Sequence, residues 1–261
     1  MRRIICLILL PFLAFYAYAQ SPNRPMGYGK SFPGVIQASR QAVNQNGSTF
    51  QATLAVRCPN EPGLLKWLAG RVQKYVTDWP AGYNRPGTDP VAEKEFRNTR
   101  ELVDYYMGIL EDALKDAGNE DFPATTHQTG LLLADCWQKG ELCTFYESVW
   151  DNESHLSRDG YITVNAKTGK AMRLEDLVSQ KDFDALSSLL MPRLENAHGV
   201  RLLDQNYGYT TDNKTVLRQL SGCAMIREGL IIYFNPYILG SGADGSYKAV
   251  IPYEYVPLAT E

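Results

Sequence analysis

The chain has 261 residues, of which 44% are hydrophobic and 21% are charged. This is ordinary globular composition, with enough chain for one large domain or two small ones. Without Arg2 and Arg3, 24 basic residues remain against 29 acidic ones, a formal charge of −5, which argues against a nucleic-acid partner and against binding to anionic lipid.

Residues 1–19 have the three parts of a secretory signal peptide. Two arginines form a basic start, residues 4–16 are apolar, and residues 17–19 (Ala-Tyr-Ala) are a small-x-small cleavage site. The sequence therefore predicts cleavage before Gln20 and an exported chain, periplasmic or extracellular in a bacterium. Because no second long apolar segment follows, we expect no stable membrane span once the signal is removed.

The rest of the chain is expected to be a flexible arm followed by one module. Residues 20–33 are rich in Pro, Gly, Ser and Asn, a composition typical of a flexible linker. Residues 34–261 form the predicted module, which has two halves, 34–165 and 166–261. No internal repeat or long linker separates the halves.

The first half begins with a predicted hairpin and two helices. Strands at 35–43 and 48–57 flank Asn46-Gly47, and an Asn-Gly pair between such runs is the strongest short signal of a β-hairpin. Apolar residues then recur at helical spacing over 63–78, which predicts an amphipathic helix. A second helix is expected over 89–118, with Asp89 as its N-cap and a proline in its first turn.

Four cysteines remain after the signal peptide, and an even number in an exported chain indicates disulfides. Strands at 124–137 and 142–150 flank a four-residue loop. A hairpin closed by that loop places Cys136 directly opposite Cys143, close enough to bridge. Cys58 and Cys223 would then form the second pair. The alternative is that some of the four are reduced and buried as small hydrophobic residues.

The second half is predicted to add strands and two helices. The strand is expected at 161–165, the turn at 166–170, a short helix at 174–178 and a longer helix at 179–196. Strands at 224–226 and 230–234 are expected to pair around residues 227–229, and a strand at 247–251 follows. Helices segregated from long antiparallel runs predict an α+β fold: one antiparallel sheet, built from hairpins and shared by both halves, with helices packed on one face.

The second half also contains five short sequence motifs in a fixed order. They are Asn165-Ala-Lys-Thr-Gly-Lys170, Leu174-Glu-Asp-Leu177, Leu230-Ile-Ile-Tyr-Phe-Asn-Pro-Tyr237, Ala243-Asp-Gly245 and Ile251-Pro-Tyr253. Together they resemble the bacterial extracytoplasmic module of unknown function found in lysozyme-sensing anti-sigma factors and ahead of peptidoglycan deacetylase domains. The resemblance covers residues 35–258 and implies an α+β fold and a binding role at the bacterial envelope. That family usually has Gly-Gly-Ala-His where this chain has Asn152-Glu-Ser-His155. No anti-sigma segment or deacetylase domain flanks the module, so the resemblance implies the module alone.

The sequence contains no motif that assigns a catalytic residue. The three histidines form no metal-type pair, although His155 lies among Asp151, Glu153 and Asp159. Those residues would suit a metal or acid/base site, and the alternative is a solvated loop. The glycine-rich loop around Asp244 lacks both the Lys-Ser/Thr of a P-loop and the alternating acids of an EF-hand, so we expect neither a metal nor a cofactor.

Four tyrosines near the C-terminus are the candidate recognition residues, together with His155. They are Tyr233, Tyr237, Tyr253 and Tyr255. Tyrosine combines an apolar ring with a polar hydroxyl, which suits a surface that binds glycan or protein. The alternative is that they are core aromatics whose hydroxyls are hydrogen-bonded.

These observations favour an exported, non-enzymatic module that binds an envelope partner, either a protein or a cell-wall glycan. Two alternatives stay open. One is a hydrolase acting on cell-wall glycan, with His155 and nearby acids as its site. The other is a structural envelope component that assembles through its tyrosine-rich C-terminal strands.

Overall fold

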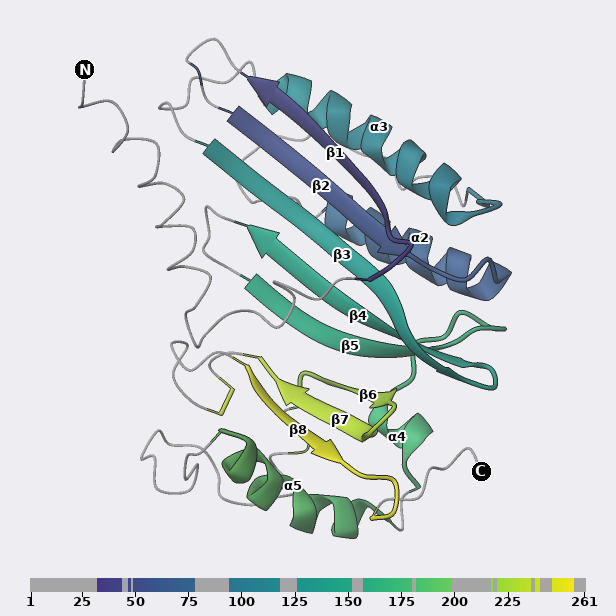
Figure 1. The fold of residues 1–261 in the computed structure, drawn as a ribbon, viewed down its shortest axis with the longest axis vertical. Coiled ribbons are helices and arrows are strands. Elements are labelled where there is room, and N and C mark those ends of the chain that lie inside the picture. The colour runs from purple at the N-terminus through teal and green to yellow at the C-terminus, as the bar shows by residue number, and fades with distance from the viewer. Residues whose placement is uncertain are drawn as a thin grey trace, which may run out of the picture.

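The computed structural model describes residues 32–43, 47, 49–77, 94–117, 126–151, 157–179, 182–198, 217, 220–235, 238–239 and 246–255. Their elements are, in chain order, β1 (Ile36–Val43), β2 (Thr49–Arg57), α2 (Pro62–Thr77), α3 (Thr99–Ala117), β3 (Thr126–Lys139), β4 (Leu142–Asp151), β5 (Ser157–Asn165), α4 (Leu174–Leu177), α5 (Phe183–His198), β6 (Gly222–Ile226), β7 (Gly229–Phe234) and β8 (Tyr247–Ile251). The strands form two sheets, β1-β2-β3-β4-β5 and β6-β7-β8 (Figure 1). The predicted α+β class is confirmed.

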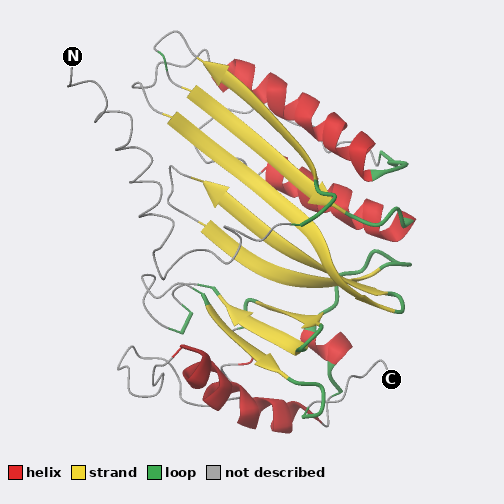
Figure 2. Ribbon diagram, viewed as in Figure 1, coloured by secondary structure: helices red, strands yellow, loops and turns green. Residues whose placement is uncertain are grey.

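The first sheet is mixed rather than wholly antiparallel. β2 and β3 run parallel, whereas its other neighbouring strands are antiparallel. Parallel neighbours need a long crossover connection, and α2 and α3 supply it between β2 and β3. Both helices cover the same face of the sheet (Figure 2). Their apolar stripes meet the inward side chains of the strands in a core that includes Phe50, Leu54, Leu68, Val103 and Leu131.

The second sheet is antiparallel throughout and has its own helix. α5 packs along β8, and the buried leucines of α5 meet the apolar side chains of β7 and β8. This core includes Leu186, Leu190, Leu194, Ile232 and Ile251. No helix in the described part of the chain is both long and apolar enough to cross a bilayer.

The other face of the second sheet packs against the first sheet at β4 and β5. Tyr146 and Tyr161 meet Ala224 and Ile231 in a small buried cluster. The two tyrosine rings pack edge to face, with centroids 5.3 Å apart. The first sheet is therefore covered by helices on one face and, at one end, by the second sheet on the other.

Two buried threonines join the sheets through the backbone of β6. The Thr144 hydroxyl donates to the Met225 carbonyl at 2.6 Å, and the Met225 N–H donates to the Thr163 hydroxyl at 2.8 Å. These side chains satisfy an edge of β6 that no described strand pairs with. The expectation of a single shared sheet is therefore wrong, because side-chain bonds, not a backbone ladder, link β5 to β6.

The second helix begins later than the sequence predicts. It starts at Thr99, and the Asn98 side chain accepts the Glu101 N–H at 2.9 Å, which makes Asn98 the N-cap in place of Asp89. Phe96 is buried even so, because it precedes the helix and packs against Tyr105 and Tyr106. Asp89 itself lies outside the described residues.

The β3–β4 hairpin closes through two residues, Gly140 and Glu141, instead of the predicted four. Gly140 has a φ of 56°, which suits glycine in a tight turn. β3 therefore runs two residues closer to the turn than predicted, and the pairing shifts at a bulge between Asp135 and Trp137.

This register corrects the predicted disulfides. Gln138, not Cys136, lies opposite Cys143, because the turn has two residues instead of four, and Cys136 itself lies in the bulge. Cys136 is exposed and Cys143 is buried, and neither forms a disulfide. Cys58 packs near the core of the first sheet and Cys223 in the core of the second, and both are free thiols.

Candidate functional site

The Thr-Gly-Lys turn after β5 is a compact loop organised by one side chain. The Asn165 Oδ1 accepts the N–H groups of Lys167 and Thr168, at 3.1 and 3.0 Å, and the Thr168 hydroxyl at 3.2 Å. Gly169 has a φ of 71°, and its N–H donates to the Asn165 carbonyl at 2.8 Å. The turn is therefore held in one shape by hydrogen bonds within it.

The turn lies directly against the start of α2. A Cβ added at Gly63 would come within 2.8 Å of the Lys167 carbonyl oxygen, and closer still to the Ala166 carbonyl oxygen. A Cβ added at Gly169 would lie 2.6 Å from the Gly63 carbonyl oxygen. The two glycines let the backbones approach more closely than side chains would allow.

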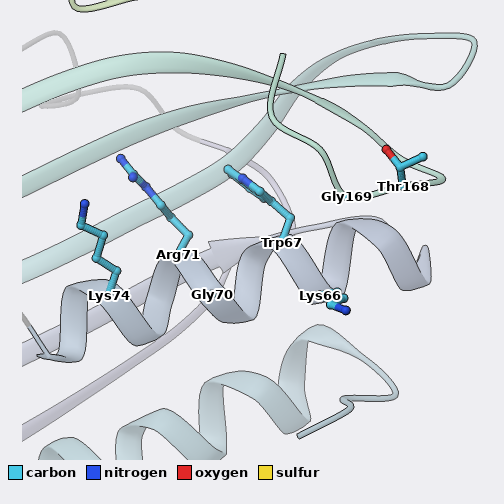
Figure 3. A pocket seen from close by; sticks show the side chains of 7 residues that line it. All are labelled: Lys66, Trp67, Gly70, Arg71, Lys74, Thr168 and Gly169. Atoms are coloured by element: carbon cyan, nitrogen blue, oxygen red, sulfur yellow. The ribbon is translucent and has the colours of Figure 1, made fainter. Parts of the chain in front are cut away.

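An open groove of about 400 Å³ lies beside this contact. Its lining consists of Lys66, Trp67, Gly70, Arg71 and Lys74 from α2, and Thr168 and Gly169 from the turn. Residues 66, 70 and 74 are each one helical turn apart, as are 67 and 71. Figure 3 shows Trp67, Arg71 and Lys74 rising from α2 on the side of the strands, and Lys66 directed to the other side of the helix.

Arg71 is the inner cation of the groove, and it is already paired. Its Nε and Nη2 donate to the two carboxylate oxygens of Glu147 on β4, each at 2.5 Å. The Glu147 side chain is only 12% exposed. This bidentate pair directs Arg71 toward the sheet and compensates its charge. An incoming anion would therefore meet other cations first.

Those cations are the lysines at the rim. Lys66 and Lys74 are exposed. Lys167, on the neighbouring turn, is 3.8 Å from Glu141, and both of these side chains are more than half exposed, so their attraction is weak. The rim therefore carries exposed lysines on a chain whose formal charge is −3. Such a rim suits a carboxylate or phosphate group.

Trp67 forms the apolar wall of the groove. Its ring packs on Phe145 of β4, with centroids 4.7 Å apart, and it is half-buried among the apolar residues beneath α2. A part of the indole still lines the groove. The site thus combines positive charge with an aromatic surface, two features common in recognition sites.

Two of the predicted recognition tyrosines have structural roles. Tyr233 occupies the space above Gly160 and Gly222, where a Cβ at Gly160 would lie 2.8 Å from its hydroxyl oxygen. Burial raises the pKa of Tyr233 to about 12. The Tyr253 hydroxyl donates to the Ile226 carbonyl at 2.6 Å.

Of the remaining predicted recognition residues, the structure describes only Tyr255. Tyr255 is 47% exposed, and the Arg193 guanidinium lies 5.3 Å from its ring centroid. Tyr237 and His155 lie outside the described residues.

Three buried or half-buried thiols, those of Cys58, Cys143 and Cys223, are protonated at neutral pH. Burial raises the pKa of Cys143 to about 12 and the pKa of Cys223 to about 12, and it raises the pKa of Cys58 still further. No group of three or more His, Cys, Asp and Glu side chains in the described ranges is placed to hold a metal ion.

The sequence contains part of the signal for the groove. Lys66, Gly70 and Lys74 are four residues apart on a helix predicted to be amphipathic, so they share one face of it. The Thr-Gly-Lys turn is a distinctive sequence motif. The sequence does not show that this turn and this helix touch, because Gly63 and Gly169 are far apart in the chain. That contact is what turns one helix face into a groove.

No protein-family model and no curated protein matches the sequence. Among solved structures, a member of the DUF3298 family from Bacteroides fragilis is similar, with a TM-score of 0.52, 16% sequence identity, and coverage of 84% of this chain and 89% of that chain. A DUF3298 family protein from Pseudomonas aeruginosa has a TM-score of 0.49, 11% identity, and coverage of 88% and 94%. A relation to anti-sigma factors or deacetylases stays a prediction. The chain is therefore similar in fold to a DUF3298 family protein.

Proposed function

We propose that this chain is an exported, non-enzymatic binding module of the bacterial envelope, and that the groove beside α2 holds an anionic group of its partner. The observation that supports this is the lining of the groove. Exposed lysines stand beside an aromatic wall, in a chain that is acidic overall. The turn that closes the groove is fixed by its own hydrogen bonds, so the site needs little ordering when a partner binds.

The anion is a carboxylate or a phosphate, and two kinds of partner carry such groups. A protein offers them as acidic side chains, and a cell-wall polymer offers them as peptide carboxylates or phosphates. The groove chemistry is the same for both, so the experiment has to separate the sources.

The test is capture from an envelope fraction by the purified exported protein. The Lys66→Glu/Lys74→Glu double variant reverses the groove charge and should reduce capture at least about tenfold, as expected for two charged contacts. The control is Arg227→Glu/Lys139→Glu, which changes the net charge equally at exposed positions in two hairpin turns. Treating the fraction with protease removes a protein partner, whereas treating it with a muramidase removes a glycan partner.

Salt supplies a second measurement. Raising the salt to about 0.5 M shortens the screening length to roughly 4–5 Å and should release a partner held by exposed lysines. Equal capture by the groove variant and the control would overturn the assignment of the groove. Capture of nothing by the unmodified protein would overturn the binding function.

Export is tested separately. The N-terminal sequence of the protein recovered from the periplasm or the medium should begin near Gln20. Recovery of the uncleaved chain from the cytoplasm alone would contradict export.

A further inference from the structure

Over β1 and the first halves of β2 and β3, no described element covers the face of the first sheet opposite α2 and α3. Side chains alternate along a strand, and the pairing of the strands fixes which of them share this face. The outward positions include Gln37, Ser39 and Gln41 on β1, Gln51 and Thr53 on β2, and Gln128, Gly130 and Leu132 on β3. Gly130 is buried, and the side chains at the other positions are exposed or half-exposed. The second sheet packs on this face over β4 and β5 and reaches Leu132 on β3.

The chemistry of this open face is uniform. The outward side chains named above are amides, hydroxyls and one leucine, although 21% of the chain is charged. Farther along the same face of β2 lies Arg57, whose guanidinium is already bonded to Asp135 at 2.7 Å, and Val43 at the end of β1 is exposed. The amides and hydroxyls also pair across the strands: Gln128 Nε2 donates to Gln51 Oε1 at 3.1 Å, and the Ser39 and Thr53 hydroxyls are 2.9 Å apart.

Trp150 borders this polar face and lies flat on the sheet. It is directly opposite Gly130 in the β3–β4 pairing. A Cβ added at Gly130 would overlap Cζ2 of the indole and both atoms bonded to it, Cε2 and Cη2. A point that is close to an atom and to both its ring neighbours lies over the face of the ring, not beyond its edge. One face of the indole therefore rests on Gly130, and the ring is half-buried, so its other side is turned from the sheet.

We infer that this face is a binding surface for an uncharged polysaccharide. A sugar ring has an apolar C–H face and a rim of hydroxyl groups. A flat indole provides the apolar contact, and amides and hydroxyls both donate and accept hydrogen bonds with the rim. The Ser39 and Thr53 hydroxyls form one hydrogen bond with each other. The second hydroxyl hydrogen and the remaining lone pairs can still bond to a sugar.

The scarcity of charge on this face distinguishes between three classes of ligand: a polyanion, a protein and a neutral glycan. A polyanion would find no cation from Gln37 to Leu132, and Arg57 beyond them is already bonded to Asp135. A protein partner would need a larger apolar centre than one indole, one leucine and Val43 at the edge. A neutral glycan requires neither. This surface is on the opposite face of the sheet from the lysine groove, so the two sites are independent.

The probes are insoluble chitin and cellulose, which are uncharged, and soluble chitin oligosaccharides. The exported protein should bind at least one of the polymers, and Trp150→Ala should weaken binding about tenfold, the order expected for one aromatic contact. Trp150→Tyr should retain most of it, because a ring still covers Gly130. Gln51→Ala should weaken binding several-fold. The matched control is Trp67→Ala, which removes the indole of the groove and should leave glycan binding unchanged.

Fluorescence gives a readout that does not depend on the folding of an alanine variant. The chain has 4 tryptophans, and oligosaccharide should change the emission of the unmodified protein. Trp150→Phe should still bind and lose that change. The inference is overturned if no neutral polymer binds, or if Trp150→Ala binds as tightly as the unmodified protein. It is also overturned if Lys66→Glu/Lys74→Glu abolishes the binding, because the glycan would then occupy the groove.

Discussion

One buried ion pair connects the two sheets, and its removal should be costly. Lys248 Nζ on β8 lies 2.7 Å from Asp159 Oδ2 on β5, and the two side chains are only 8% and 5% exposed. Asp159→Asn keeps the shape of the side chain and removes its charge, which leaves a buried ammonium group without a counter-ion. Breaking such a pair costs about 3–5 kcal/mol. That is a large part of the roughly 5–15 kcal/mol by which a domain is stable.

Urea unfolding of the exported protein measures this cost. We expect Asp159→Asn to lower the free energy of unfolding by about 3–5 kcal/mol. The Asp159→Asn/Lys248→Met double variant should lose much less than the sum of the single variants, because no charge is then left buried. The control is Lys167→Gln, since the Lys167–Glu141 pair is 3.8 Å apart and exposed, and it should cost at most about 0.5 kcal/mol. If Asp159→Asn costs no more than Lys167→Gln, the pair does not hold the sheets together.

Three further substitutions test other contacts. Gly63→Ala should cost about 1–3 kcal/mol, because its Cβ would meet the Ala166 carbonyl, whereas Gly108→Ala on α3, which has open space, should not destabilise. The pKa of His198 lies below its usual value because the ring is buried, and its Nε2 accepts the Lys248 N–H at 2.9 Å. As the pH falls, His198 is therefore protonated in the unfolded chain at a higher pH than in the folded chain. The contribution of His198 is present above its ordinary pKa of about 6.5 and is lost on acidification through the folded pKa, a pH dependence that His198→Gln should remove. Tyr253→Phe should cost about 1 kcal/mol through the lost bond to Ile226, whereas Tyr255→Phe should be nearly neutral in the same urea titration.

Elements with strong local signals are those that the sequence predicts well. The strand at 247–251 is observed with these bounds, and the helix predicted over 63–78 is observed as Pro62–Thr77. The antiparallel pairing of β6 with β7 and of β1 with β2 is confirmed too. In each case the information lies within a short segment, as alternating or helical spacing next to a turn.

Strand partners across long connections were not predictable in this way. The parallel pairing of β2 with β3 depends on how α2 and α3 fold back, and no spacing within either strand reports it. The β6 edge is satisfied by Thr144 and Thr163, which lie in other parts of the chain. The two-residue turn at Gly140 likewise places Gln138, not Cys136, opposite Cys143, because β3 runs two residues farther than the sequence predicts.

Several glycines matter in this fold for the space they leave, and this is why the candidate sites were hard to predict. The sequence interpretation treats glycine as a residue of turns and helix ends. In the structure, Gly130 lies under Trp150, and Gly63 lets the Thr-Gly-Lys turn reach α2. Neither contact has a local pattern, because the residue that needs the space is distant in the chain. Both candidate binding surfaces depend on such a contact, so a glycine substitution should reveal each site as clearly as a change to the residues that line it.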